Sequence, residues 1–463
     1  MGISVHSLRP LSAILTTIQQ SSSSEIRERL LRYRWFVYGV QVTSMLVVNF
    51  QFVLPATIGN QLATEWNLDA TALGLLGAVL FYIYAMMQVP SGFVLDVWGP
   101  RKSSTVGLLI MAVGQLVFSL ANGLEVALIG RALIGFGAGP TFIAILKNQV
   151  KWFRVREFAT LVGVVTIVAF SGSILGTAPL AYMVTQLGWR VPVLIVAGFT
   201  LALAVVNWMF VRDDPRDLGY PSISQIDPDA PSATMADSAN PQRRELLREA
   251  ITTWRRTRPV WIVSLIVMLG YGSFQSFQLL WAGSYLIHVH QQSTVTAATT
   301  LLSLLIGAGV GSIVAGYLSD NVFHARRPFI IAGALGTSFV WVVIVAMTSE
   351  VGALRINVVF ALLSFIAGFM LMGVTMVKEA VRPEIFGTVF GAFNTFAFLG
   401  NALFQLLMGA LLNISDVTVI DGSRIYGLSG YRLTFSAALA GSLIALVLAF
   451  VLPETLRKKQ TDE

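Results

Sequence analysis

The sequence predicts an all-α membrane protein with twelve transmembrane helices in two pseudo-symmetric six-helix bundles. Of its 463 residues, 55% are hydrophobic and only 12% are charged, whereas about a quarter of the residues in a typical soluble domain are charged. The hydrophobic runs are of helical length, because about 20 residues are needed to cross a hydrocarbon core of roughly 30 Å. One long polar segment, 212–258, divides these runs into six and six.

The twelve predicted spans follow one another with short connections, except at this central segment. They cover residues 35–58, 69–95, 103–121, 124–150, 157–184, 190–211, 260–287, 295–318, 328–347, 354–377, 385–412 and 430–452. Residues 1–34 contain no apolar stretch followed by a small-residue cleavage site, so we predict no removed signal peptide. The predicted parts are an N-terminal segment 1–34, an N-terminal bundle 35–211, a linker 212–258, a C-terminal bundle 259–453 and a tail 454–463.

Lys and Arg are distributed very unevenly between the two sets of connections. Nearly all of the 31 lie at the termini, in 212–258 or in the connections on that same side, and the exceptions are Arg131, Arg190, Arg355, Arg424 and Arg432. Because cationic loops stay on the cytoplasmic side, we predict a multi-pass inner (plasma) membrane protein with both termini and the linker in the cytoplasm. The net charge of +7 follows from this bias and from attraction to anionic headgroups. We therefore expect the lipid bilayer, and no nucleic acid, as a partner.

The second part of the linker, RRELLREAITTWRRTR, places Leu247, Ile251 and Trp254 on one helical face among arginines. This pattern predicts a helix lying on the inner leaflet. The segment Glu25 to Trp35 has a similar pattern. An ordinary solvated charge cluster is the alternative for both.

A polar motif that ends the second span occurs again at the end of the eighth. Each copy has a glycine, an aspartate four residues later and then two adjacent cations. The residues are Gly92, Asp96, Arg101 and Lys102 in the first copy, and Gly316, Asp320, Arg326 and Arg327 in the second. This recurrence indicates a duplicated six-helix half, and parallel halves around a midplane cavity are typical of a large class of transporters.

These residues resemble the signature of the major facilitator superfamily, G-x-x-x-D-R-x-G-R-R/K. Gly92, Asp96, Gly99 and Arg101 match it, whereas Val97 and Pro100 depart from it. The Gly-Pro-Arg-Lys form is similar to that of bacterial organic-anion permeases such as the anion:cation symporters, and of related amino-acid permeases. The resemblance implies a monomeric secondary transporter, not an enzyme, that takes up a small polar, anionic organic solute by alternating access, with a proton or another ion as a candidate coupling partner. Export of drugs or metabolites is the alternative.

The signature implies a conformational latch at the inner boundary of the membrane. We expect Gly92 to let two helices pack closely, and Asp96 and the following cations to form ion pairs that hold the halves together until the cavity opens inward. The second copy would do the same at Asp320 and Arg326. The alternative is that Asp96 caps a helix and that Arg101 and Lys102 only obey the positive-inside rule.

Polar residues within the spans are the candidates for the substrate site, because such residues are costly in lipid and usually face a cavity or a partner helix. In the family that the sequence resembles, spans 1 and 7 line the cavity. The candidates there are Asn49 and Gln51 in span 1, and Tyr271, Gln275, Gln278 and Trp281 in span 7. Hydrogen bonding between helices is the alternative.

Arg131 is the only cation well inside a predicted span. An arginine there costs roughly 2.5 to 3.5 kcal/mol on insertion scales, so we expect a substrate anion or a polar network from span 1 to compensate it. Snorkelling to the outer surface is the alternative.

Several chemistries have no support in the sequence. There is no cysteine, which excludes disulfides, thiolate metal sites and cysteine nucleophiles. The middle thirds of the spans contain no Asp or Glu, which weakens proton coupling through a buried acid and disfavours an intramembrane enzyme. We expect no cofactor and no metal.

Overall fold

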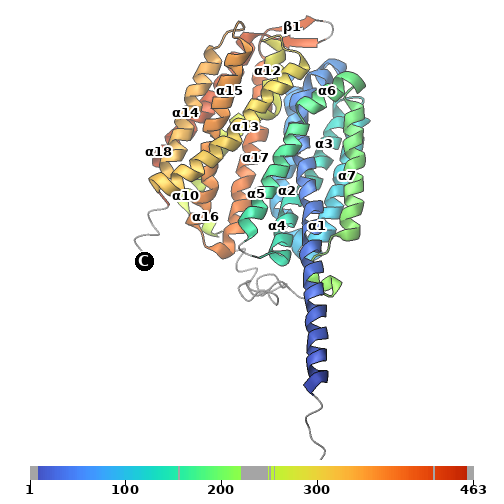
Figure 1. The fold of residues 1–463 in the computed structure, drawn as a ribbon. Coiled ribbons are helices and arrows are strands. Elements are labelled where there is room, and N and C mark those ends of the chain that lie inside the picture. Colours follow the sequence, from blue (N-terminus) through green and yellow to red (C-terminus); the bar gives the residue numbers. More distant parts are fainter. Residues whose placement is uncertain are drawn as a thin grey trace, which may run out of the picture.

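The computed structural model describes residues 9–154, 157–220, 249, 252–254, 256–420 and 423–455. They form two helical bundles side by side, the first coloured blue to green and the second yellow to red (Figure 1). The predicted all-α fold of two bundles is confirmed. The proposed surface helix around Leu247 and Ile251 lies outside the described residues.

The N-terminal bundle contains seven helical segments that make six crossings. They are α1 (Arg9–Glu65), α2 (Ala70–Ser119), α3 (Leu124–Ala138), α4 (Thr141–Trp152), α5 (Phe158–Leu175), α6 (Ala178–Leu187) and α7 (Arg190–Phe210). Helix α2 contains two crossings, because its backbone turns at Gly99, where φ is +79°. Helices α3 and α4 together make one crossing, as do α5 and α6.

The C-terminal bundle begins with one long crossing that contains two π turns. Its parts are α10 (Arg258–Ile266), η5 (Val267–Tyr271), α11 (Gly272–Ser276), η6 (Phe277–Trp281) and α12 (Ala282–His288). The remaining crossings are built from α13 (Thr294–Leu318) with η7 (Ser319–Phe323), α14 (Arg327–Ala346), α15 (Ala353–Ala367) with η8 (Gly368–Leu371) and α16 (Met372–Ala380), α17 (Pro383–Asn413), and α18 (Leu428–Val451).

Eleven helices of the described chain are long and apolar enough to cross a membrane. Since the 50-residue α2 counts once in this number but bends into two arms, the twelve predicted crossings are all present. Glycine suits this bend, because a Cβ at position 99 would lie 2.4 Å from Asp213 Oδ2 and the positive φ favours glycine.

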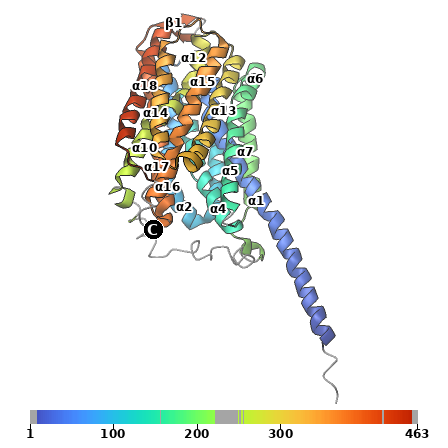
Figure 2. The same cartoon turned by 60° about the vertical axis from the view of Figure 1, so that its left-hand side comes forward.

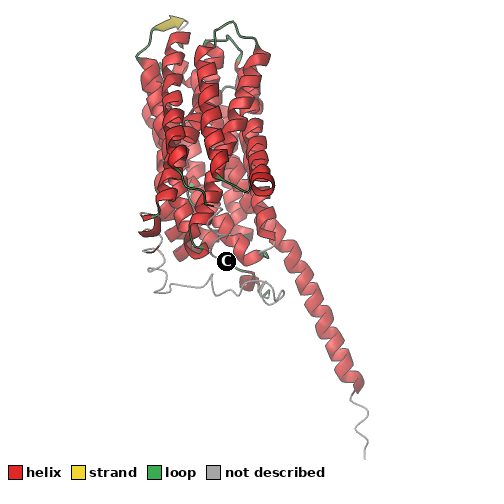
Figure 3. Cartoon of the chain, turned by 90° about the vertical axis from the view of Figure 1, so that its left-hand side faces the viewer, coloured by secondary structure: helices red, strands yellow, loops and turns green. Residues whose placement is uncertain are grey.

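The two ends of the molecule differ, and we name them by what they carry. The termini end carries the lower part of α1, which projects beyond the bundles (Figure 2), and Glu454, which follows α18. The hairpin end carries a short antiparallel hairpin of β1 (Val417–Ile420) and β2 (Ser423–Tyr426), shown in yellow in Figure 3. The sequence predicted this segment only as an outward loop.

Helices within a bundle approach closely where small residues meet backbone. A Cβ at Gly311 of α13 would lie 1.9 Å from the carbonyl oxygen of Phe365 in α15, and a Cβ at Gly307 would lie 2.0 Å from Ser364 Oγ. In lipid, such contacts replace the hydrophobic effect as the force between helices. Gly307 and Gly311 therefore serve packing.

We predict that the hairpin end faces outward and the termini end faces the cytoplasm, because the cationic connections gather at the latter. The absence of cysteine permits a direct test with Val419→Cys on the hairpin, where Val419 is 65% exposed, and Leu218→Cys at the termini end, where Leu218 is 38% exposed. A membrane-impermeant maleimide added to intact cells should label only the first variant, and permeabilised cells should label both. Labelling of Leu218→Cys in intact cells would overturn the orientation.

Candidate functional site

The two bundles meet at an aromatic cluster midway along the first arm of α2. Phe52, Phe81 and Tyr84 of the N-terminal bundle surround Phe398 of α17, with ring centroids 4.6 Å apart for Tyr84 and Phe398 and 5.9 Å apart for Phe52 and Phe398. Such separations are typical of favourable aromatic pairs. The sequence offered no signal for the three phenylalanines, since it contains 29 of them.

From this cluster to the hairpin end the bundles are in direct contact, along what we call the seam. A Cβ at Gly283 of α12 would lie 2.3 Å from the carbonyl oxygen of Ala56, and a Cβ at Gly409 of α17 would lie 2.4 Å from that of Ala70. Ser284 donates a hydrogen bond across the seam to Asn60 Oδ1 at 2.8 Å. The structure is therefore closed at the hairpin end.

The termini end is packed less closely. A Cβ added at Gly92 or at Gly391 would meet no atom within 4 Å. A close helix approach at Gly92, which the signature led us to expect, is therefore not found in this structure. The nearest atom to a Cβ at Gly316 would be Met372 Cε at 3.9 Å, so the second copy of the motif is also loosely packed here.

Arg131 is fully buried in α3, between α1 and α2. Its Nη1 donates to the carbonyl oxygen of Gln51 at 2.9 Å, and its Nε donates to that of Leu76 at 3.3 Å. Nη2 has no hydrogen-bond partner among the described residues. Arg131 thus does not snorkel to the surface, and it can still bind one further acceptor.

The span 1 candidates point in different directions. Gln51 is fully buried, and neither atom of its side-chain amide has a partner in the described chain. Asn49 is partly buried and donates to the carbonyl oxygen of Met45, one turn earlier in α1, at 3.0 Å. Arg131 contacts the backbone carbonyl of Gln51, and Asn49 makes no hydrogen bond with Arg131 among the described residues.

The span 7 candidates lie on or between the two π turns. Tyr271 ends η5, Gln275 lies in α11, and Gln278 and Trp281 lie in η6. In each π turn the backbone hydrogen bonds run from i to i+5 and not from i to i+4. Residues spaced for one face of an α-helix therefore do not stay on one face through the turn. Tyr285 of α12 packs inside its own bundle, with its ring 5.1 Å from that of Phe435.

Trp281 connects span 7 to α17. Its indole is buried and donates to the carbonyl oxygen of Gln405 at 3.2 Å, while Gln405 Nε2 donates to Asn401 Oδ1 at 3.1 Å. Gln278 is also buried, whereas Tyr271 and Gln275 are partly buried. Gln405 in turn faces α2, since a Cβ at Gly77 would lie 2.4 Å from its Oε1. The side-chain amide of Gln405 therefore lies at the seam.

At the termini end of the N-terminal bundle, Asp96 forms an ion pair with Lys147 of α4. The Arg101 backbone N–H donates to Asp213 Oδ1 at 2.5 Å, and its guanidinium donates to the carbonyl oxygen of Trp208 at 2.7 Å. Burial raises the pKa of the Asp213 carboxyl above its ordinary value, although the bond from Arg101 acts in the opposite direction. Lys102 is exposed.

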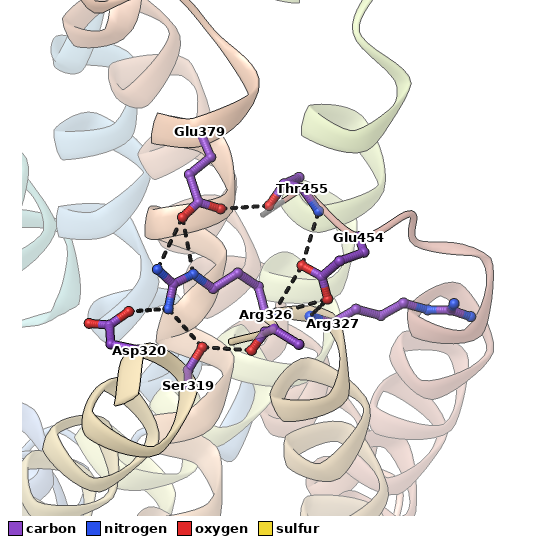
Figure 4. Close-up of polar contacts among 8 residues, drawn as sticks. Ser319, Asp320, Arg326, Arg327, Glu379, Glu454 and Thr455 are labelled. Atoms are coloured by element: carbon purple, nitrogen blue, oxygen red, sulfur yellow. Dashed lines mark hydrogen bonds and ion pairs between the residues drawn. The ribbon is translucent and has the colours of Figure 1, made fainter. Parts of the chain in front are cut away.

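The C-terminal bundle has a corresponding network centred on Arg326 (Figure 4). Arg326 forms ion pairs with Asp320 and with Glu379, the latter at 3.1 Å, and donates to Ser319 Oγ at 2.7 Å. Glu454, just after α18, accepts from the backbone N–H groups of Arg326 and Arg327 at 3.0 and 2.9 Å. Thr455 Oγ1 donates to Glu379 at 2.8 Å, so the network also holds the chain that follows α18.

The two networks use equivalent positions in the two bundles. In each, a carboxylate after the sixth crossing accepts a hydrogen bond from a backbone N–H at the start of the third crossing. Asp213 accepts from Arg101 in one bundle, and Glu454 accepts from Arg326 in the other. In each, an arginine there donates to a carbonyl in the last turn of the sixth crossing, as Arg327 does to Phe450 at 2.6 Å. These ion pairs join helices within a bundle, whereas the sequence led us to expect pairs between bundles.

Twelve crossings in two equivalent bundles are an architecture typical of secondary transporters. The chain belongs to the Major Facilitator Superfamily, because residues 40–405 match the sequence model of that family.

Several curated relatives align with most of the chain. A "Probable hexose phosphate transport protein" of Chlamydia trachomatis is 25% identical, covering 86% of this chain and 85% of the relative. A "D-galactonate transporter" of Escherichia coli is 25% identical, covering 75% of this chain and 82% of the relative. A "Probable sulfoacetate transporter SauU" of Cupriavidus necator is 24% identical over 63% of this chain and 66% of the relative.

Solved structures share the fold at lower identity. A bacterial homologue of the human lysosomal transporter Spinster, in an inward-facing and unoccupied conformation, has a TM-score of 0.69 at 15% identity, covering 91% of this chain and 97% of that one. A D-xylose-proton symporter has a TM-score of 0.67, also at 15% identity, covering 89% of this chain and 97% of that one.

We predict that Arg326→Ala lowers the thermal stability of the protein, because it leaves Asp320 and Glu379 without their shared cation. The cost should lie between the about 1 kcal/mol of an exposed ion pair and the about 3 kcal/mol of a buried one, since Asp320 is exposed whereas Glu379 is mostly buried. Arg326→Lys should recover only part of it, because an ammonium lacks the guanidinium fork. The measurement is the unfolding temperature in detergent, with Lys102→Ala as the control, and equal values for Arg326→Ala and the control would show that the network does not stabilise the fold.

Proposed function

We propose that the protein takes up a small anionic organic solute by alternating access of its two bundles. The observation that carries this proposal is the environment of Arg131, a fully buried cation with one guanidinium nitrogen unpartnered among the described residues. Arg131 forms no ion pair with a carboxylate in the part of the chain that the structure describes. An anion is the partner that would complete its hydrogen bonding.

The free energies involved favour a ligand role over a purely structural one. A buried donor without a partner costs about 1 to 3 kcal/mol. Gln51, whose backbone carbonyl accepts from Arg131, adds an amide with neither atom paired. A carboxylate, phosphate or sulfonate could accept from the arginine fork and from this amide. The relatives named for hexose phosphate, galactonate and sulfoacetate support the same class of solute.

In alternating access, the end of the molecule that is closed would change from the hairpin end to the termini end. In the observed state the seam is closed from Phe398 to the hairpin end, whereas Gly92 and Gly391 at the termini end have no neighbour within 4 Å of an added Cβ. We propose that the reverse state closes the termini end and opens the seam, and that residues of the N-terminal network, Asp96 foremost, then form pairs between bundles. The proposed coupling partner is a proton or another ion, and the proposed functional unit is a monomer.

The test of the substrate class is a thermal-shift screen of the purified protein. Candidate anions are glucarate, galactonate, sulfoacetate and a hexose phosphate, with the uncharged hexose as the control. A ligand present at 100 times its dissociation constant stabilises the native state by about 2.7 kcal/mol. Stabilisation by the neutral sugar alone, or by none of the anions, would contradict an organic-anion site.

We predict that Gln51→Leu and Arg131→Lys each weaken binding of the stabilising anion at least tenfold. Gln51→Leu should not destabilise the fold, because it removes two buried polar atoms that have no partner. Gln115→Leu is the matched control, since Gln115 is equally buried and equally unpartnered but lies on the second arm of α2. If both glutamine variants bind alike, Gln51 has no role in the site.

We predict that Asp96→Asn slows transport far more than it weakens binding, because it changes the balance between the two states and not the solute contacts. The variant loses its charge pair with Lys147 but keeps the size of the side chain. Counterflow rates in proteoliposomes, compared with affinities from the thermal-shift titration, separate the two effects. A normal transport rate would remove Asp96 from the latch.

A further inference from the structure

The β1–β2 hairpin belongs to the C-terminal bundle but is fastened to the N-terminal one. Ser423 and Thr64 share a hydrogen bond at 2.8 Å, Arg424 Nε donates to Asn67 Oδ1 at 3.3 Å, and the Tyr426 hydroxyl accepts from the backbone N–H of Ala70 at 2.9 Å. All three hairpin residues are on β2, which pairs antiparallel with β1. The β1 residues Val417 to Ile420 are exposed.

Tyr426 occupies the start of α2. The first N–H groups of a helix have no partner within it, and here Asp69 caps Ala72 while Tyr426 takes the N–H of Ala70. The Tyr426 side chain is 4% exposed. The hairpin therefore supplies one of the hydrogen bonds that complete the N-terminus of a helix in the other bundle.

A pocket of about 170 Å³ lies under the hairpin, between the bundles. Its walls come from α1 and α2 on one side and from α12, α17 and the hairpin on the other. They include Asn60, Asp69, Trp281, Ser284, His288 and Tyr426. Trp281 reaches from this pocket to Gln405 at the seam, so the pocket lies between the hairpin and the polar residues of the proposed site.

Polar groups around this pocket are engaged in closing it. Asn60 accepts from Ser284 at 2.8 Å, and Asp69 Oδ2 accepts from Asn413 Nδ2 at 3.1 Å. Both bonds cross between the bundles, as do the three made by the hairpin. A separation of the bundles at this end must break all five and expose the same groups to water.

We propose that the β1–β2 hairpin is the gate of the transport route at this end: docked on Thr64, Asn67 and Ala70 it closes the pocket, and it must undock for the pocket to open. This gate rests on the proposed alternating access but not on the identity of the solute. While the hairpin is docked, the seam is covered, and its release uncovers Asn60, Asp69 and Ser284 as the lining of the entrance.

The first test measures opening without any solute. Ser284→Cys places a thiol in the pocket of a cysteine-free chain, where Ser284 is 4% exposed. An impermeant maleimide applied from the hairpin side should react several-fold faster when Tyr426→Phe and Arg424→Ala are added, because these remove two of the docking bonds. Val419→Ala is the matched control, because Val419 lies on β1 and is 65% exposed. Equal rates in the docking variant and the control would disprove the gate whether or not organic anions are transported.

The second test keeps the hairpin docked and guards against misfolding of the first variants. Thr64→Cys with Ser423→Cys should form a disulfide under mild oxidation, since the two hydroxyl oxygens are 2.8 Å apart. Ser284→Cys is then added to this double variant, and its thiol is blocked reversibly during the oxidation. Once the disulfide has formed, the reactivity of the Ser284→Cys thiol with the maleimide should fall at least tenfold, and reduction should restore it. Failure of the disulfide to form, or undiminished reactivity once it has formed, would overturn the proposal.

Discussion

The placement of charge relative to lipid governs this structure. A charged side chain in a hydrocarbon environment must reach the interface or find a partner, and only 12% of the residues carry charge. Asp96, Arg101, Asp320 and Arg326 therefore lie at the termini end, where they pair with the ends of neighbouring crossings. Arg131 is the exception within a crossing, and the carbonyls of α1 and α2 satisfy only part of its donors.

The same constraint shapes the contact between the bundles. Two helical bundles in lipid gain nothing from burying apolar surface against each other, so their contact depends on close packing and hydrogen bonds. Glycines provide the close packing, at Gly283 against Ala56 and at Gly409 against Ala70. Hydrogen bonds from the hairpin and from Ser284 add direction. Contacts of this kind are short in range and few, which allows one end of the seam to open while the bundles stay intact.

The sequence predicted the features that depend on composition and repetition. Length and hydropathy placed the twelve crossings, and the repeated Gly-Asp-cation motif placed Asp96 and Asp320 at equivalent positions. It did not identify Lys147 as the partner of Asp96, nor Glu379 and Glu454 as partners of Arg326, because these residues come from crossings distant in the chain. The π turns of span 7 were also missed, since one extra residue per turn leaves no mark in a run of apolar residues. The hairpin was missed because its strands have only four residues each.

The two networks occupy equivalent positions but differ in rigidity. The planar guanidinium of Arg326 contacts Asp320, Glu379 and Ser319 at once. Glu454 accepts a hydrogen bond from the Arg326 backbone N–H. A guanidinium with several directed bonds is a fixed joint, because all of them must break together. Asp96 is held instead by Lys147, a flexible ammonium whose side chain is 30% exposed. A point charge on a long chain can exchange partners without passing through a state in which a buried carboxylate is unpaired. The N-terminal network is therefore the one suited to change during transport, and the C-terminal network is suited to keep its bundle rigid while it does so.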